Sequence, residues 1–146
     1  KLDYLNKLYA AMGRSATFDK VLSTYDSSTA MKEVNSVLDE LNKLEKLNNN
    51  NIPRMVRNYF LELCFVIFEM ARVTKSGGYC AMVNDNVRYG GEEIPVDLLL
   101  SEFAENFGFN IQKIFVLPRG KGNSSQQMGN YGRTEIRKCV YLWQKR

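Results

Sequence analysis

The chain has 146 residues, of which 45% are hydrophobic and 25% charged, proportions typical of one globular domain with a sizeable core. It contains no histidine, which excludes imidazole metal ligands and the serine–histidine and cysteine–histidine nucleophile pairs. Its formal net charge of +4 permits a polyanionic partner without requiring one.

Helical patterns fill the first half of the chain. Apolar residues at helical spacing predict a helix over residues 1–13, and because this helix has no capping residue at its start, we expect the chain to be cut from a longer one. Residues 14–28 are rich in Ser, Thr and Asp, which predicts a loop with a short helix around residues 18–22. Residues 29–47 show the three- and four-residue spacing of an amphipathic helix.

A second, longer helix is predicted from Pro53 to about Lys75, after four asparagines that favour a turn. Its middle is apolar almost all round, so we expect other layers to cover it on most sides. The apolar run within it, residues 59–71, is shorter than a membrane span and is interrupted by Glu62 and Glu69. The sequence therefore predicts no membrane segment, and with no signal peptide we expect a cytoplasmic protein.

Strands are predicted in the second half. The continuous apolar run over residues 79–83 is typical of a central strand covered on both faces. A helix over residues 95–107, a strand over 111–117 and a last strand over 139–143 follow. Since no helix separates the last two strands, we expect them to be antiparallel. The order of elements predicts an α/β layered fold.

The three cysteines are widely spaced and lie in apolar stretches, at positions Cys64, Cys80 and Cys139. This pattern indicates buried, reduced thiols rather than disulfides or a zinc site. We expect no metal.

Polar residues follow the first predicted strand, where open α/β sheets place their ligands. Asn84, Asp85 and Asn86 are candidates for such a site, but an ordinary turn explains them equally well. The next residues, from Arg88 to Gly91, fit an ordinary surface loop better than a phosphate contact. Arg54 and Arg57, one turn apart on the long helix, would either meet phosphate or form its solvated face.

A Gly- and Ser-rich segment before the last strand combines cations, amides and one aromatic ring. Such side chains bind phosphates, base edges and base faces. The residues concerned are Arg119, Lys121, Asn123, Ser124, Gln126, Gln127, Asn130, Tyr131 and Arg133. Taken alone, the composition favours an ordinary solvated hairpin loop. Glu135 would orient a loop arginine or form a weak surface ion pair.

Three features of the second half resemble a known enzyme family. They are the turn Lys75-Ser76-Gly77-Gly78, the polar strand end Val83-Asn84-Asp85, and Gly108-Phe109 after the following helix. Together they resemble the second half of class I S-adenosylmethionine-dependent methyltransferases, above all the DNA enzymes that modify cytosine N4 or adenine N6. The likeness covers residues 53–143.

The resemblance implies a partial Rossmann-like methyltransferase fold, a three-layer sheet with helices whose last strand is antiparallel. Residues 53–146 would form the carboxyl-terminal half of that domain, and residues 1–52 a helical segment covering or inserted beside the sheet. The implied function is methyl transfer from S-adenosylmethionine to an exocyclic amino group of DNA, as in restriction-modification. With the resemblance, contact of the polar segment with a flipped base becomes the favoured interpretation.

Departures from the family pattern are also informative. The glycine-rich loop for S-adenosylmethionine and the catalytic tetrapeptide are missing, because Gly-x-Gly occurs only at Gly120-Lys121-Gly122 and no Pro-Pro exists. We therefore expect a cofactor site mostly outside this chain, with Asn84 and Asp85 as its candidate contacts here. The chain would be inactive without the amino-terminal half of the enzyme. The alternatives are a non-catalytic module that binds nucleic acid or a partner, and a methyltransferase for RNA or protein.

Overall fold

The structure is a computed structural model that describes residues 2–118 and 136–146. Its described helices are α1 (Leu2–Ala11), α2 (Ser15–Ser27), α3 (Thr29–Lys43), α4 (Ile52–Val73) and α5 (Val96–Asn106). Its described strands are β1 (Tyr79–Asp85), β2 (Val87–Tyr89), β3 (Glu92–Ile94), β4 (Phe109–Val116) and β5 (Lys138–Lys145). The chain is thus α/β, and the predicted elements occur in the predicted order.

Two segments that we expected to be mainly loop form regular secondary structure. Residues 15–27 form a full helix, because Phe18, Val21 and Tyr25 recur at helical spacing and are buried, while the polar residues between them face outward. Residues 87–94 form the hairpin β2–β3, in which Tyr89 pairs with Glu92. The two glycines between these strands adopt φ values of +57° and +92°, a left-handed turn that glycine accommodates without strain.

The main sheet has the order β1-β5-β4, and both neighbouring pairs are antiparallel. The predicted antiparallel pairing of the last two strands is confirmed. The prediction that β1 is central and covered on both faces is wrong for the described residues. β1 lies at the edge, and its residues alternate between half-buried and exposed, with Tyr79 59% and Val83 54% exposed.

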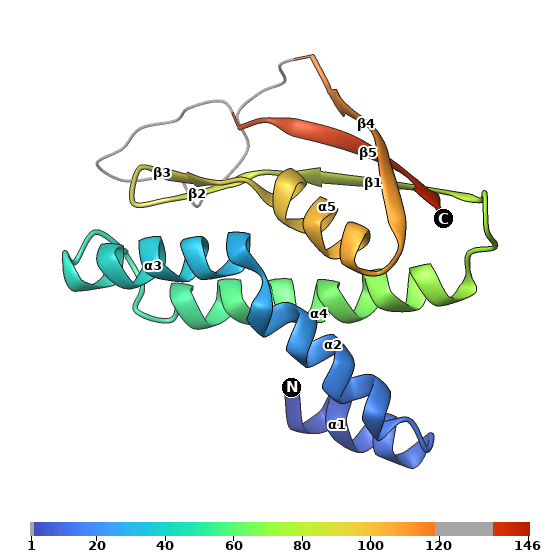
Figure 1. Cartoon of the computed structure of the whole chain (residues 1–146). Helices are drawn as coiled ribbons and strands as arrows, with labels where there is room; N and C mark the ends of the chain where they lie inside the picture. The colour runs from blue at the N-terminus through green and yellow to red at the C-terminus, as the bar shows by residue number, and fades with distance from the viewer. Residues whose placement is uncertain (1, 119–135) are drawn as a thin grey trace.

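All described helices lie on one side of this sheet (Figure 1). α5 packs directly against the strands, and α4 lies beneath α5. On the other face, Val83, Val140 and Phe115 lie in register across the three strands. The described residues therefore form only two of the three expected layers.

The core lies between α4, α5 and β5. Its largest fully buried side chains include Phe60 and Ile67 of α4, Phe103 of α5 and Trp143 of β5. The cysteines are all free, and Cys64 and Cys139 are buried while Cys80 is half-buried. Among the described residues there is no His, Cys, Asp and Glu cluster of metal-binding size, and no helix long and apolar enough to cross a bilayer.

Candidate functional site

The candidate site lies at one end of the three-stranded sheet. β1 and β4 are both antiparallel to β5, so they run in the same direction and end at the same edge. At this edge Asp85 pairs with Lys138, and Val116 pairs with Cys139. We call this the carboxyl edge and define it by residues 84–86, 116–118 and 136–138.

The predicted base-contacting residues lie outside the described part of the chain. They are Arg119, Lys121, Asn123, Ser124, Gln126, Gln127, Asn130, Tyr131 and Arg133, together with Glu135. The described residues that flank them do lie at the carboxyl edge, where the Leu117 amide donates a 2.9 Å hydrogen bond to the Lys138 carbonyl. The predicted strand-end candidates and both flanks of the polar segment therefore meet at one edge of the sheet.

Asn84 and Asp85 point to opposite faces of the sheet, as successive residues of a strand must. Asn84 faces the helices, where its Oδ1 accepts a 3.3 Å hydrogen bond from the Tyr59 hydroxyl of α4. Asp85 faces the open side and forms a 3.5 Å ion pair with Lys138. Burial, and then the charge of Asp85, raises the pKa of Tyr59. The two candidates thus share an edge but not a pocket.

A shallow depression of about 360 Å³ lies beside Tyr59 on α4. Arg54 lines it together with Asn58 and Glu62, and the Arg54 guanidinium donates to Asn51 at 3.1 Å. Arg57 instead joins α4 to α3 through a 2.9 Å hydrogen bond to Asn35 and an ion pair with Asp39. Of the two predicted arginines, Arg54 lines the same depression as Tyr59, whose hydroxyl contacts Asn84 at the carboxyl edge.

Asn86 has a structural role, in agreement with the turn interpretation. It is buried, its amide donates to Glu93 at 2.8 Å, and its Oδ1 accepts from the Asp97 backbone at 3.2 Å. In the hairpin that follows, Arg88 donates to the Gly91 carbonyl at 2.7 Å, and Tyr89 is buried. These contacts fix the hairpin and the start of α5 against the end of β1.

One polar cluster at the carboxyl edge was not predicted. Asp97, in the first turn of α5, is 1% exposed, forms an ion pair with Arg137 and accepts a 3.4 Å hydrogen bond from the Cys139 thiol. Burial, then the hydrogen bond and charge of Asp97, raise the pKa of Cys139 to about 11. An acidic residue in a first helical turn is an ordinary sequence signal. Its partners Arg137 and Cys139 lie about forty residues further along the chain, and no local sequence pattern predicts contacts over that separation.

The hydroxyl of Tyr141 lies close to this cluster. In the described part of the chain it is buried and has no hydrogen-bond partner. Burial, followed by the charge of Asp97, raises its pKa. A buried hydroxyl without a partner is uncommon in folded proteins and is a place where a water molecule commonly binds.

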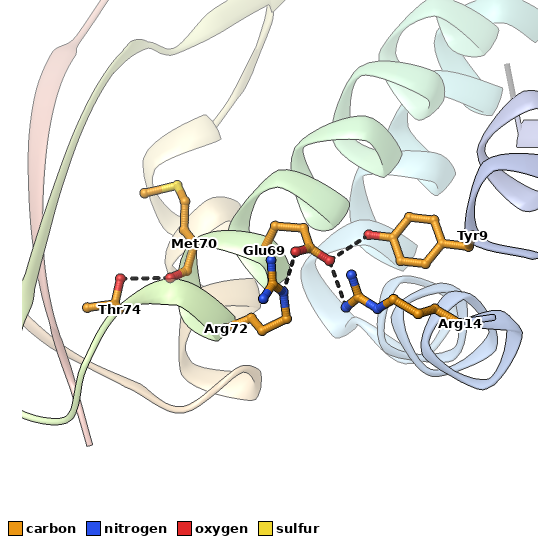
Figure 2. Close-up of polar contacts among 6 residues, drawn as sticks. All are labelled: Tyr9, Arg14, Glu69, Met70, Arg72 and Thr74. Carbon is orange, nitrogen blue, oxygen red and sulfur yellow. Dashed lines mark hydrogen bonds and ion pairs between the residues drawn. The ribbon is translucent and has the colours of Figure 1, made fainter. Parts of the chain in front are cut away.

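A second surface feature is an apolar groove of about 860 Å³ between α1 and α4. Leu8 and Met12 line one side, and Val66 and Val73 the other. Figure 2 shows the polar cluster at its rim, where the Tyr9 hydroxyl and the Arg14 guanidinium both reach Glu69 at 3.0 Å. Arg72 contacts the same carboxylate at 2.6 Å. Glu69 thus pairs with both arginines at this groove.

Comparison with characterised proteins shows what the chain is similar to. It is 52% identical over 128 residues, 88% of its length, to the proteins named Type II methyltransferase M.AvaI of Nostoc sp. and of Anabaena variabilis. It is 41% identical over 145 residues, 99% of its length, to Type II methyltransferase M.BsoBI of Geobacillus stearothermophilus. The chain spans only 27% and 28% of these relatives. No family model and no solved structure matches it.

Proposed function

The chain belongs to the type II methyltransferases, and we propose that it forms the portion of such a DNA methyltransferase that receives the target base. The observation that carries the proposal is the 52% and 41% identity to type II methyltransferases over nearly the whole chain. The common carboxyl edge, where β1 and β4 both end, supports it because open α/β sheets bind their ligands there. A cytoplasmic location follows from action on cellular DNA.

The reaction we propose is methyl transfer to cytosine N4 or adenine N6. This chemistry needs acceptors that orient the amino group and a surface on which the flipped base stacks, and it does not need a strong base. A chain without histidine suits that requirement. We assign the base contacts to the segment from Arg119 to Arg133, whose two flanks lie at the carboxyl edge.

We propose that the described residues form only part of the site for S-adenosylmethionine. The depression beside Tyr59 is shallow and lined by Arg54, Asn58 and Glu62, and Asn84 and Asp85 face opposite sides of the sheet. We therefore assign most of the cofactor site to the rest of the polypeptide. Asn84 and Asp85 would contribute from the edge.

The open side of the sheet supports the proposal that another part of the polypeptide completes the enzyme. Within the described residues β1 pairs only with β5, and its outer edge adjoins the exposed side chains of Tyr79 and Val83. An unpaired edge beside an uncovered apolar face is a surface that proteins usually cover. We place there a part of the remaining polypeptide that precedes this chain.

The direct test is methyl transfer by the polypeptide that contains this chain. It would be incubated with duplex DNA and S-adenosylmethionine carrying an isotopic methyl label, and the digested nucleosides would be analysed by mass spectrometry. Labelled N4-methylcytosine or N6-methyladenine is the expected product. Label in RNA or protein alone, or DNA binding without transfer, would replace this proposal by one of the alternatives.

A pair of variants tests the open face. Val83→Lys should abolish transfer by the complete polypeptide while leaving the melting temperature of this chain unchanged, because Val83 is exposed here. The control is Val37→Lys, on the exposed side of α3, which should change neither quantity. Full activity of the Val83→Lys enzyme would show that nothing covers this face.

Asp85 offers a test of the cofactor contact. Asp85→Ala should raise the KM for S-adenosylmethionine, and Asp3→Ala, which removes another exposed ion pair, should not. An unchanged KM in both variants would remove Asp85 from the site.

A further inference from the structure

We propose that Arg137 binds a phosphate of the DNA backbone and that the buried carboxylate of Asp97 is the positioning residue that orients it. This inference rests on the proposed function and extends it to a residue outside the predicted base-side segment. It concerns the described residues of the carboxyl edge alone.

Asp97 is held rigidly. Its backbone amide donates to Asn86, and its Oδ1 accepts a 2.9 Å hydrogen bond from the Leu98 amide. Its Oδ2 faces both Arg137 and the thiol of Cys139. With both oxygens engaged and the side chain 1% exposed, the carboxylate has one orientation.

Arg137 combines a fixed position with access to solvent. Its carbonyl accepts a 2.9 Å hydrogen bond from the Asn86 amide, which fixes the backbone, and its side chain is 40% exposed. A guanidinium has five N–H donors in a planar fork, so pairing with Asp97 leaves donors on the solvent side. An arginine held in this way loses little conformational freedom when it binds a phosphate.

Stability alone explains this pair poorly. A buried carboxylate paired with arginine contributes little net stability, since desolvation offsets the attraction. We therefore assign the pair the role of orienting the guanidinium. The position also fits, because Arg137 belongs to the carboxyl edge, to which the target base is assigned.

The experiment is DNA binding by the polypeptide that contains this chain, measured by fluorescence anisotropy on a labelled duplex over a series of salt concentrations. Arg137→Ala should weaken binding about tenfold at low salt. It should also lower the salt slope, the steepness with which the logarithm of the binding constant falls with the logarithm of salt concentration, by about 1, which corresponds to the loss of one phosphate contact. Arg137→Lys should keep the slope and bind with intermediate affinity. Asp97→Asn should also keep the slope while weakening binding, because the cation remains but loses its orientation.

Two matched controls separate orientation from folding. Arg72→Ala removes another half-exposed arginine that pairs with a carboxylate, but at the end of α4 away from Tyr59, and should not change binding. Cys139→Ala removes the thiol that contacts Asp97 but leaves both members of the Asp97–Arg137 ion pair in place, and it should keep both slope and affinity. Circular dichroism would verify the fold. Because Arg137→Ala leaves the buried Asp97 carboxylate without its cation, Arg137→Lys, which keeps the charge, decides the question if Arg137→Ala or Asp97→Asn unfolds, and an affinity equal to that of the unaltered polypeptide would then contradict the inference.

The outcomes distinguish this inference from the proposed function. If the unaltered polypeptide binds and methylates DNA but Arg137→Ala keeps its slope and affinity, the inference is wrong and the function stands. If the unaltered polypeptide binds no DNA at any salt concentration, both are wrong.

Discussion

The hydroxyl of Tyr9 donates a 3.0 Å hydrogen bond to Glu69, sixty positions away in the chain. This bond, with the ion pair from Arg14, attaches the first helix to the middle of the molecule. Burial acts to raise the pKa of Glu69, but hydrogen bonds from Arg72, Tyr9 and Arg14 outweigh it and hold the pKa below its usual value.

Glu69→Gln should therefore remove part of the acid sensitivity of folding. A carboxyl whose pKa is lowered in the folded state stabilises the protein above its unfolded pKa of about 4.3, and that stabilisation is lost as the pH falls through the folded pKa. We expect the free energy of unfolding of the variant to be lower by about 1–2 kcal/mol near neutral pH. Below about pH 4 its free energy of unfolding should fall less than that of the unaltered chain. Urea unfolding at several pH values measures this, with exposed Glu33→Gln as the control.

Two buried tyrosines should make folding sensitive to alkali. Burial raises the pKa of Tyr9 and of Tyr25 to about 12. The neutral phenol is therefore favoured in the folded state, and stability should fall as the pH rises from about 10 to about 12. Tyr25→Phe, which loses the bond to the Arg57 carbonyl, should cost about 1 kcal/mol and remove one late-ionising group from the ultraviolet titration. Ionisation of all tyrosines in one step near pH 10 would contradict this.

Glu102 should act as a cap for another helix. Its two carboxylate oxygens accept 3.1 Å hydrogen bonds from the backbone amides of Thr29 and Ala30 at the start of α3. Glu102→Ala should lower the free energy of unfolding by about 1 kcal/mol, and Glu102→Gln by less, since the amide keeps an acceptor. The control is Glu105→Ala on the exposed side of α5. Equal effects at both positions would mean that helix propensity alone is responsible.

Tyr141→Phe tests the unpaired hydroxyl. If that hydroxyl has no partner in solution, its removal should leave the free energy of unfolding unchanged or raise it by up to about 1 kcal/mol. We expect this result, measured by thermal and urea unfolding. A clear loss of stability would show that a bound water molecule satisfies the hydroxyl.

Local periodicity explains what could be predicted from the sequence. α3, α4 and α5 were located to within a few residues because their apolar residues recur at helical spacing. α2 was predicted only as a short helix around residues 18–22, because Ser, Thr and Asp on its solvent side obscured the helical spacing of the buried Phe18, Val21 and Tyr25. The edge position of β1 could not be predicted, since an apolar run does not reveal which faces the rest of the chain covers.

The candidate site also has parts that the sequence could predict and parts that it could not. Asn84 and Asp85 were located by their place after a strand, but the sequence did not show that they face opposite sides of the sheet. The contact of Asp97 with Arg137 joins residues that are close only after α5, β4 and β5 have packed. Contacts of that kind depend on tertiary structure and have no local pattern.

The uncovered edge of β1 has a practical consequence for work with the isolated chain. Within the described residues β1 pairs only with β5, so alternate residues of this strand direct unpaired backbone groups outward, beside exposed Tyr79 and Val83. Two molecules that meet at this edge can extend one sheet into the other, so self-association should rise with protein concentration. A lysine at Val83 would then improve behaviour in solution at the same position where it disables the enzyme.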